Sequence, residues 1–295
     1  MKKNKQFNLC VAMLAMLCVS IIGLRASDER VSRAQPALIP APQSVEWKEQ
    51  AVPLKSVKII LPDIKGDKLR GSQMKTELKE ILVLNNIKMN QKSNTQVRLR
   101  LGKVETPNQW AGQEDEAYEL VACKDGVVIT ANTVTGLYRG VQTLRQLVVT
   151  KEGKTSIAMC EILDYPAFKI RGYMHDVGRN FQSIEQLKMQ IDVMAAYKYS
   201  VFHWHLTDHY GWRLESKVYP TLQSKGAFGR WHGKFYTQAE FKDLVDYCWA
   251  RGMIIIPEFD TPGHSEAFRH GLKIKNMKDP KAIEAICKLV DEVCT

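Results

Sequence analysis

The stretch FHWHLTDHYGWR (residues 202–213) gathers histidine, aromatic and charged side chains into one short segment. Side chains alternate between the two faces of a β-strand, so a strand here would turn Phe202 and Trp204 to one face. His203 and His205 would share the opposite face. The large apolar side chains would thus lie on one face and the imidazoles on the other. This pattern favours a buried strand that carries a site on its histidine face.

Asp208 follows directly after this predicted strand. Barrel and open α/β folds collect their chemistry at the carboxyl ends of their strands, which makes this position a candidate. Two other segments have the same character, and the full set is RGYMHDVGRNF (171–181), HWHLTDHYGWR (203–213) and IPEFDTPGHSEA (256–267). We therefore predict that polar groups from three strand ends converge on one active site.

The sequence around these segments alternates strands with amphipathic helices. Apolar runs predict strands at 170–177, 200–206 and 253–259. The pairs Ser183 with Gln186 and Thr237 with Glu240 form capping boxes that begin two helices, and a last helix begins near Asp279 and Pro280. Repeated βα units favour a parallel sheet that closes into a barrel. The predicted fold is α/β, an incomplete parallel (β/α)8 TIM barrel of about three βα units over residues 166–295.

A different pattern precedes the barrel. Short strands are predicted at 57–61, 97–101, 118–122 and 127–131, and helices at 71–84 and 136–149. Strands and helices mixed at this density predict a small α+β domain over residues 36–165. No chemically reactive residues cluster in it, so we expect the site in the barrel portion.

Residues 1–26 have the order of a secretory signal peptide: lysines, then an apolar run, then small residues. We expect cleavage there and export to the periplasm or the extracellular space, with no stable membrane span. Removing this segment lowers the formal charge from +10 to +6, because it holds four basic residues and no acidic one. The remaining basic residues are scattered, which argues against nucleic acid as a partner.

Five cysteines follow the predicted signal peptide: Cys123, Cys160, Cys248, Cys287 and Cys294. Their number is odd, and their spacing matches neither a disulfide framework nor a metal motif. We expect them to be mostly buried small apolar residues without disulfides.

Taken together, the three segments resemble the β-N-acetylhexosaminidases of glycoside hydrolase family 20. That family carries an arginine–glycine pair on the first barrel strand, H-x-H-L-T-D after the second and E-x-D-x-P-G-H after the third. The stretch 116–148 resembles the end of the α+β domain that precedes the barrel in this family, so the resemblance covers residues 36–295. It implies hydrolysis of terminal non-reducing β-linked N-acetylhexosamines with retention, in which the substrate's 2-acetamido oxygen is the nucleophile.

The resemblance also implies residue roles. Arg171 corresponds to the arginine that holds hydroxyls of the terminal sugar, and a structural ion pair with Asp176 is the alternative. Asp208 and His264 correspond to an aspartate and a histidine that hydrogen-bond in series behind the catalytic glutamate. A helix cap and a loop-ordering histidine are the alternative for this pair.

Three acidic residues, Asp176, Glu258 and Asp260, are expected to support these groups from behind. Trp204 and Trp212 are expected in the core, with sugar platforms as the alternative. The predicted partner is a glycan or an amino-sugar oligosaccharide, and the sequence leaves the oligomeric state open. No cofactor is expected.

The chain departs from the family pattern in two places. His209 stands where many relatives have a second acidic residue. The H-x-G-G-D-E segment that supplies the family's orienting aspartate and acid glutamate does not occur within these 295 residues. Asp291 and Glu292 lie in a helical pattern and do not fit that pair. We therefore expect an incomplete enzyme whose activity as given is low.

Two other readings stay open. His203 and His205, two positions apart on one strand face, could both bind one ion in a metal-dependent barrel hydrolase. The chain could also be an inactive glycan-binding or structural fragment.

Overall fold

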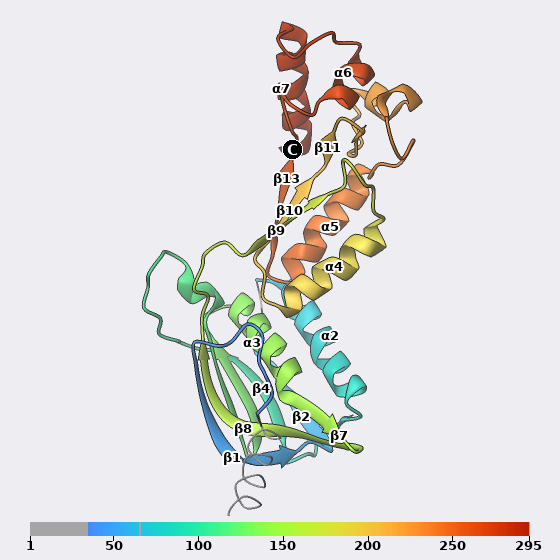
Figure 1. The fold of residues 1–295 in the computed structure, drawn as a ribbon. Helices are drawn as coiled ribbons and strands as arrows, with labels where there is room; N and C mark the ends of the chain where they lie inside the picture. The colour runs from blue at the N-terminus through green and yellow to red at the C-terminus, as the bar shows by residue number, and fades with distance from the viewer. Residues whose placement is uncertain (1–34, 65, 295) are drawn as a thin grey trace, which may run out of the picture.

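The computed structural model describes residues 35–64 and 66–294, so the predicted signal peptide lies outside the described residues. The chain forms two portions that each combine helices with a sheet, an amino-terminal one around a large mixed sheet and a carboxyl-terminal one around a three-stranded parallel sheet (Figure 1). Within the described ranges, no helix has the length and apolar character that crossing a membrane requires.

The amino-terminal portion is built on an eight-stranded mixed sheet. Its path runs β1-β8-β5-β6-β4-β2-β3, and β7 pairs with β8 beside it. The strands are β1 (Ser44–Pro53), β2 (Ser56–Ile60), β3 (Lys88–Met89), β4 (Gln96–Leu101), β5 (Tyr118–Cys123), β6 (Gly126–Ala131), β7 (Val148–Lys151) and β8 (Lys154–Asp164). Pairing from β1 to β6 is antiparallel and pairing from β6 to β3 is parallel, as in an α+β domain.

Helices α2 (Lys68–Leu84) and α3 (Val134–Leu147) pack with this sheet. Helix α3 is buried along most of its length, and its Gly140 faces Ile129 so closely that a Cβ would lie 2.5 Å from that side chain. Helix α2 also contacts α5 of the second portion. One hydrophobic core therefore runs through both portions.

The carboxyl-terminal portion contains three parallel strands in the order β13-β10-β9. They are β9 (Gly172–Asp176), β10 (Val201–His205) and β13 (Ile254–Glu258), and helices α4 (Ile184–Ala196) and α5 (Gln238–Ala250) connect them. Both predicted capping boxes are present, with Ser183 and Thr237 as the N-caps. Phe202 and Trp204 are fully buried, and Trp204 stacks on Phe241 of α5. The strand therefore presents the faces that the alternation predicts.

Smaller elements lie above the carboxyl ends of these strands. They are the hairpin β11 (Thr207–Asp208) and β12 (Gly211–Trp212), the short 3-10 helices η2 (Pro220–Gln223) and η3 (Lys225–Ala227), and helices α6 (Glu266–Leu272) and α7 (Pro280–Cys294). Another 3-10 helix, η1 (Gln113–Glu116), precedes β5. Trp212 is buried against Phe259 and Phe268 in a second small core, so both tryptophans are core residues as predicted.

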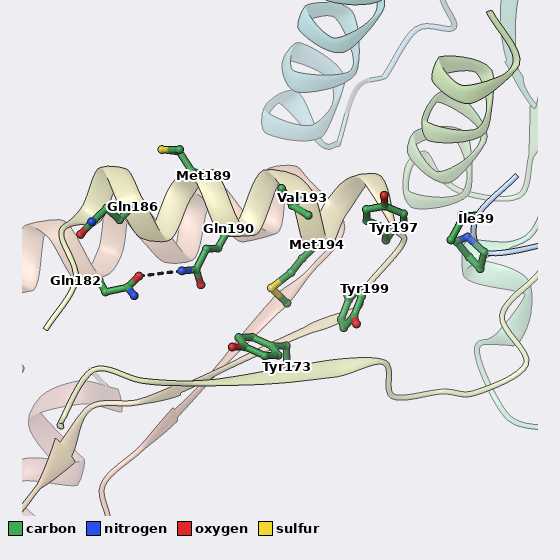
Figure 2. A pocket seen from close by; sticks show the side chains of 11 residues that line it. Ile39, Tyr173, Gln182, Gln186, Met189, Gln190, Val193, Met194, Tyr197 and Tyr199 are labelled. Carbon is green, nitrogen blue, oxygen red and sulfur yellow. Dashed lines mark hydrogen bonds between the residues drawn. The ribbon is translucent and has the colours of Figure 1, made fainter. Parts of the chain in front are cut away.

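The three-stranded sheet is open, because β9 and β13 each pair only with β10 among the described residues. Beside β9, an apolar groove of about 820 Å³ runs along α4 and is lined by side chains such as Tyr173, Met189, Val193 and Tyr199 (Figure 2). An open three-stranded parallel sheet is compatible with the predicted incomplete barrel.

The cysteine prediction is partly wrong. All five described cysteines are free, as expected, and Cys160 and Cys248 are buried. Cys287 and Cys294, however, are exposed on α7, and Cys123 is half-buried. The helix positions them on its outer side, which the spacing of cysteines in the sequence does not reveal.

Candidate active site

Strand register brings three predicted groups to the same level of the sheet. Asp176 of β9 and Glu258 of β13 both pair with His205 of β10, each at the last residue of its strand. Because the strands are parallel, the loops that follow them leave from one rim. These loops carry the remaining charged groups of the site.

Asp208 is the centre of this rim and is almost completely buried, with 1% of its surface exposed. Its Oδ1 atom accepts a hydrogen bond from the His209 amide at 2.6 Å. Its Oδ2 atom lies 2.9 Å from Arg179 Nη2 and 3.5 Å from His205 Nε2. One carboxylate oxygen is thus fixed by the backbone, and the other faces the cationic and imidazole groups of the site.

His264 reaches the rim from the loop after β13. Its Nδ1 atom bonds to Asp260 Oδ2 at 2.6 Å and lies 4.0 Å from Asp208 Oδ2. The backbone at His264 has a φ of 45°, a left-handed conformation that is uncommon for histidine. The structure brings Asp208 and His264 close together, but the histidine's hydrogen bond goes to Asp260 rather than to Asp208.

The placement predicted for Arg171 is wrong. Arg171 precedes β9, so it lies at the amino end of the strand, opposite the rim. Its guanidinium binds Glu116 at 2.5 Å and donates to the carbonyl oxygens of Lys198 and Phe168. Its ion pair is also not with Asp176, the alternative considered from the sequence. Arg171 holds the two portions of the chain together.

Arg179 is the arginine that the structure places at the rim. It follows β9 and binds Asp176 Oδ2 at 2.5 Å as well as Asp208. The hydrogen bond to Asp176 raises the pKa of Arg179, which stays charged, and 42% of its side chain is exposed. The sequence held a signal for this residue: Arg179 lies just after a predicted strand, as Asp208 does, whereas Arg171 lies at the start of one.

The supporting acids take different places. Asp176 forms an ion pair with the Arg179 guanidinium and accepts a hydrogen bond from the Arg179 backbone amide. Glu258 lies between two histidines, with Oε2 at 2.6 Å from His203 Nε2 and 3.1 Å from His205 Nδ1. Asp260 binds His264 as described above. The structure places all three within the cluster.

Arg213 shapes the loops of this rim without contacting a carboxylate there. It is fully buried, and its guanidinium donates to main-chain carbonyl oxygens of Val177, Gly178, Tyr210, Arg230, Trp231 and Lys234. Burial lowers the pKa of Arg213 to about 10. The sequence analysis missed this residue, because five of the six carbonyls come from distant segments and meet it only in the folded chain.

The two acidic residues near the end of the chain lie inside α7, as predicted. Glu292 accepts hydrogen bonds from Ser216 and from the amides of Lys217 and Val218. It orders the loop at residues 216–218. Neither Asp291 nor Glu292 belongs to the site.

Comparison with known proteins agrees with this architecture. The model of the glycosyl hydrolase family 20 catalytic domain matches residues 168–290, and the model of that family's domain 2 matches residues 35–165. A β-hexosaminidase of Porphyromonas gingivalis is 40% identical over 166 residues, which are 52% of this chain and 21% of the relative. The chain thus spans about a fifth of that protein and about a third of others, such as the Akkermansia muciniphila β-hexosaminidase.

Solved structures give the same result. The Flavobacterium johnsoniae chitobiase has a TM-score of 0.75 and 29% identity over 88% of this chain and 43% of its own. An exo-β-N-acetylglucosaminidase from Vibrio harveyi, solved with N-acetylglucosamine, has a TM-score of 0.68 and 28% identity over 81% of this chain and 39% of its own. The two family models together account for nearly all described residues. The chain belongs to glycosyl hydrolase family 20.

Proposed function

We propose that this chain contributes its rim to a β-N-acetylhexosaminidase, which removes terminal non-reducing β-linked N-acetylhexosamine residues from glycans. The observation that carries the proposal is the convergence of Arg179, Asp208 and His264 from the loops after three consecutive strands. The family match and the N-acetylglucosamine bound in the Vibrio harveyi relative support it.

The proposed chemistry is substrate-assisted hydrolysis with retention, in which the tethered acetamido oxygen attacks the sugar carbon. Tethering removes much of the entropic cost of that attack, so the protein has to orient the sugar and supply proton transfer. Arg179, rather than Arg171, would hold sugar hydroxyls, since its guanidinium is at the rim and partly exposed.

His264 would carry the proton-transfer support. Its Nδ1 atom is held by Asp260 and lies near Asp208, so Nε2 is the nitrogen that would face the acid of the reaction. The hydrogen bond between Nδ1 and Asp260 fixes the tautomer and the orientation of the ring. Asp208 and His264 thus act as positioning residues for an acid supplied by another segment.

Sugar binding tests the arginine assignment on the chain itself. N-acetylglucosamine is titrated into the 295-residue protein, and the binding constant is measured by NMR chemical shifts. We expect Arg179→Met to weaken binding at least about tenfold, because charge-assisted hydrogen bonds are lost. Arg171→Lys, the matched control at the other end of the strand, should bind as the parent does. Equal binding by Arg179→Met and the parent would refute the assignment.

Turnover tests the reaction. Hydrolysis of 4-nitrophenyl N-acetyl-β-glucosaminide and of the corresponding galactosaminide is followed with the longest gene product that contains these residues. We expect release of nitrophenol with a β-configured sugar as first product. Binding without any turnover in that product would favour the glycan-binding alternative.

We also propose export to the periplasm or the extracellular space, on the basis of the lysine-rich start and apolar run of residues 1–26. Amino-terminal sequencing of the protein from a fractionated culture tests this. A mature protein that begins after residue 26 in the exported fraction is expected, and an uncleaved protein retained inside the cell would refute it.

A further inference from the structure

We propose that His205, Asp208 and Asp260 form a binding site for one divalent transition-metal ion, with Zn²⁺ as the probe. His205 is buried, with 4% of its surface exposed. Nδ1 lies 3.1 Å from Glu258 Oε2, while Nε2 lies 3.5 Å from Asp208 Oδ2 and 3.9 Å from Asp176 Oδ1. Neither ring nitrogen makes a well-aligned hydrogen bond to any described residue.

This arrangement leaves a charge conflict. A neutral imidazole has one N–H and one lone pair, so it can satisfy a carboxylate through one nitrogen only. With the proton on Nδ1, toward Glu258, the lone pair on Nε2 points at carboxylate oxygens. A metal ion between Nε2 and Asp208 Oδ2 would accept this lone pair and attract the carboxylate.

Geometry favours a metal ion. The potential ligand atoms of His205, Asp208 and Asp260 all lie within 4.8 Å of one another. Tetrahedral zinc holds its ligands at about 2.0–2.2 Å, which places neighbouring ligand atoms about 3.3 Å apart. The separation of 3.5 Å between His205 Nε2 and Asp208 Oδ2 is close to that value. Only the Asp260 carboxylate has to approach further, and its amide is already held by Thr207 Oγ1 at 2.9 Å.

The surroundings of His205 also resemble those of a metal ligand. A histidine that binds a metal usually donates its other N–H to a carboxylate, which fixes the ring and the tautomer. Glu258 Oε2 lies beside Nδ1 at 3.1 Å, where such a carboxylate would be, and His203 Nε2 contacts the same oxygen at 2.6 Å. His203 therefore supports the site through Glu258. This assignment differs from the sequence-based alternative, in which His203 and His205 both bind the ion.

The negative charge around this site can balance the charge of a divalent cation. Four carboxylates surround His205 and His264, those of Asp176, Asp208, Glu258 and Asp260, and Arg179 is the cation that contacts two of them. The Arg179 side chain is partly exposed, so it can leave Asp208 when a metal arrives. One imidazole with carboxylates suits zinc, manganese or iron better than magnesium, which requires octahedral oxygen ligands.

Metal binding would oppose the proposed hydrolysis, and this consequence rests on the proposed function. The ion would occupy Asp208 Oδ2 and draw Asp260 away from His264 Nδ1. Both carboxylates that position His264 would then be engaged by the metal. The site is thus an inhibitory one, at which zinc switches off the positioning of the acid.

The test measures zinc binding on the 295-residue chain after removal of metal with a chelator. Isothermal titration is carried out in a Cys287→Ser, Cys294→Ser background, because these exposed thiols could bind zinc themselves. We expect one Zn²⁺ per chain, no competition by excess Mg²⁺, and about tenfold or more weaker binding in His205→Ala, Asp260→Asn and Glu258→Gln. His270→Ala, which removes an exposed histidine on α6, should bind as the background does.

X-ray absorption of the zinc complex identifies the ligands, and nitrogen and oxygen without sulfur are expected. Zinc affinity unchanged in His205→Ala would overturn the proposal, as would a doubly protonated His205 seen by ¹⁵N NMR together with no zinc binding. Because binding is measured without turnover, it stands apart from the proposed function: zinc binding in a protein without hydrolase activity would leave this site intact and refute only the hydrolase.

Discussion

The three barrel strands carry charged clusters at both ends, and the two clusters are built differently. At the amino ends, Glu116 binds Arg139 and Arg171, while Lys198 binds Asp164 and the Tyr118 hydroxyl. Arg139 also donates to the carbonyl oxygens of Arg251 and Gly252 across the domain boundary. We call this set of groups the junction cluster. At the carboxyl ends, carboxylates outnumber cations and His205 has no aligned partner.

The junction cluster stabilises the fold, whereas the rim cluster has the features of a reactive site. Burial alone would raise the pKa of Glu116, but the charges of Arg139 and Arg171 outweigh it and hold that pKa below its usual value. Complete pairing of this kind fixes two domains against each other. Unpaired polar groups at the rim cost stability, and proteins keep such groups mainly where they bind or react.

The largest effect is expected at the junction cluster. Glu116→Ala leaves Arg139, which is 1% exposed, and Arg171 without their shared carboxylate. Removing one partner of a buried ion pair costs about 3–5 kcal/mol, and we expect a loss of that size in the free energy of unfolding. Urea denaturation of the chain measures it. A change below about 1 kcal/mol would show that the junction is not held by this pair.

The next effect is expected at the rim and in activity rather than stability. Asp208→Asn, or His264→Ala, should lower turnover by about 100-fold, which corresponds to about 2.7 kcal/mol of transition-state stabilisation, with a modest change in sugar binding. Turnover is measured on the longest gene product. Asp125→Asn, an exposed position in the amino-terminal domain, is the control. Unchanged turnover in both rim variants would refute their positioning role.

A backbone substitution tests the geometry of the rim. A Cβ on Gly178 would lie 2.8 Å from Asp208 Cβ and 3.0 Å from the Thr207 carbonyl carbon. Gly178→Ala should displace Asp208, reduce turnover by about tenfold and lower the free energy of unfolding by about 1–3 kcal/mol. Gly226→Ala, where nothing lies within 4 Å, should have neither effect. Parent-like turnover in Gly178→Ala would mean that the loop moves without disturbing Asp208.

The smallest effect concerns pH. The folded pKa of Glu116 is lowered from its ordinary value of 4.5, so its contribution to stability is complete above pH 4.5 and is lost as the pH falls through the folded pKa. Below pH 4.5 the free energy of unfolding should fall by at most about 1.4 kcal/mol per pH unit from this group. Glu116→Gln should remove that part of the dependence. Parallel pH profiles for parent and variant, measured by denaturation, would contradict it.

Much of the fold could be predicted from local patterns. The strands of the barrel portion and both capping boxes follow from apolar runs and cap residues within one segment. The missed elements depend on distant contacts: β1 and β8 pair across more than a hundred residues, and β11 with β12 is a two-residue ladder above the sheet. Such pairings leave little periodicity in the sequence, because their stability comes from the partner strand.

Part of the site could also be predicted from local patterns. Asp208, Asp176, Glu258 and Asp260 lie in the cluster because each ends or follows a strand, and chain direction alone places strand ends. Arg171 precedes the five-residue strand β9, and Arg179 follows it. Which of the two arginines lies at the rim therefore depends on where this strand begins and ends. The resemblance selected the first, and the strand boundary selects the second.

Local apolar spacing, caps and short motifs were enough to predict the family, the three barrel strands and the helices α4, α5 and α7. Tertiary structure decided which charges are paired. The junction cluster with Glu116 and the rim cluster with His205 draw on segments far apart in the chain. Whether a buried charge is compensated depends on distances of a few ångströms between those segments, and these exist only once the sheet has set its register.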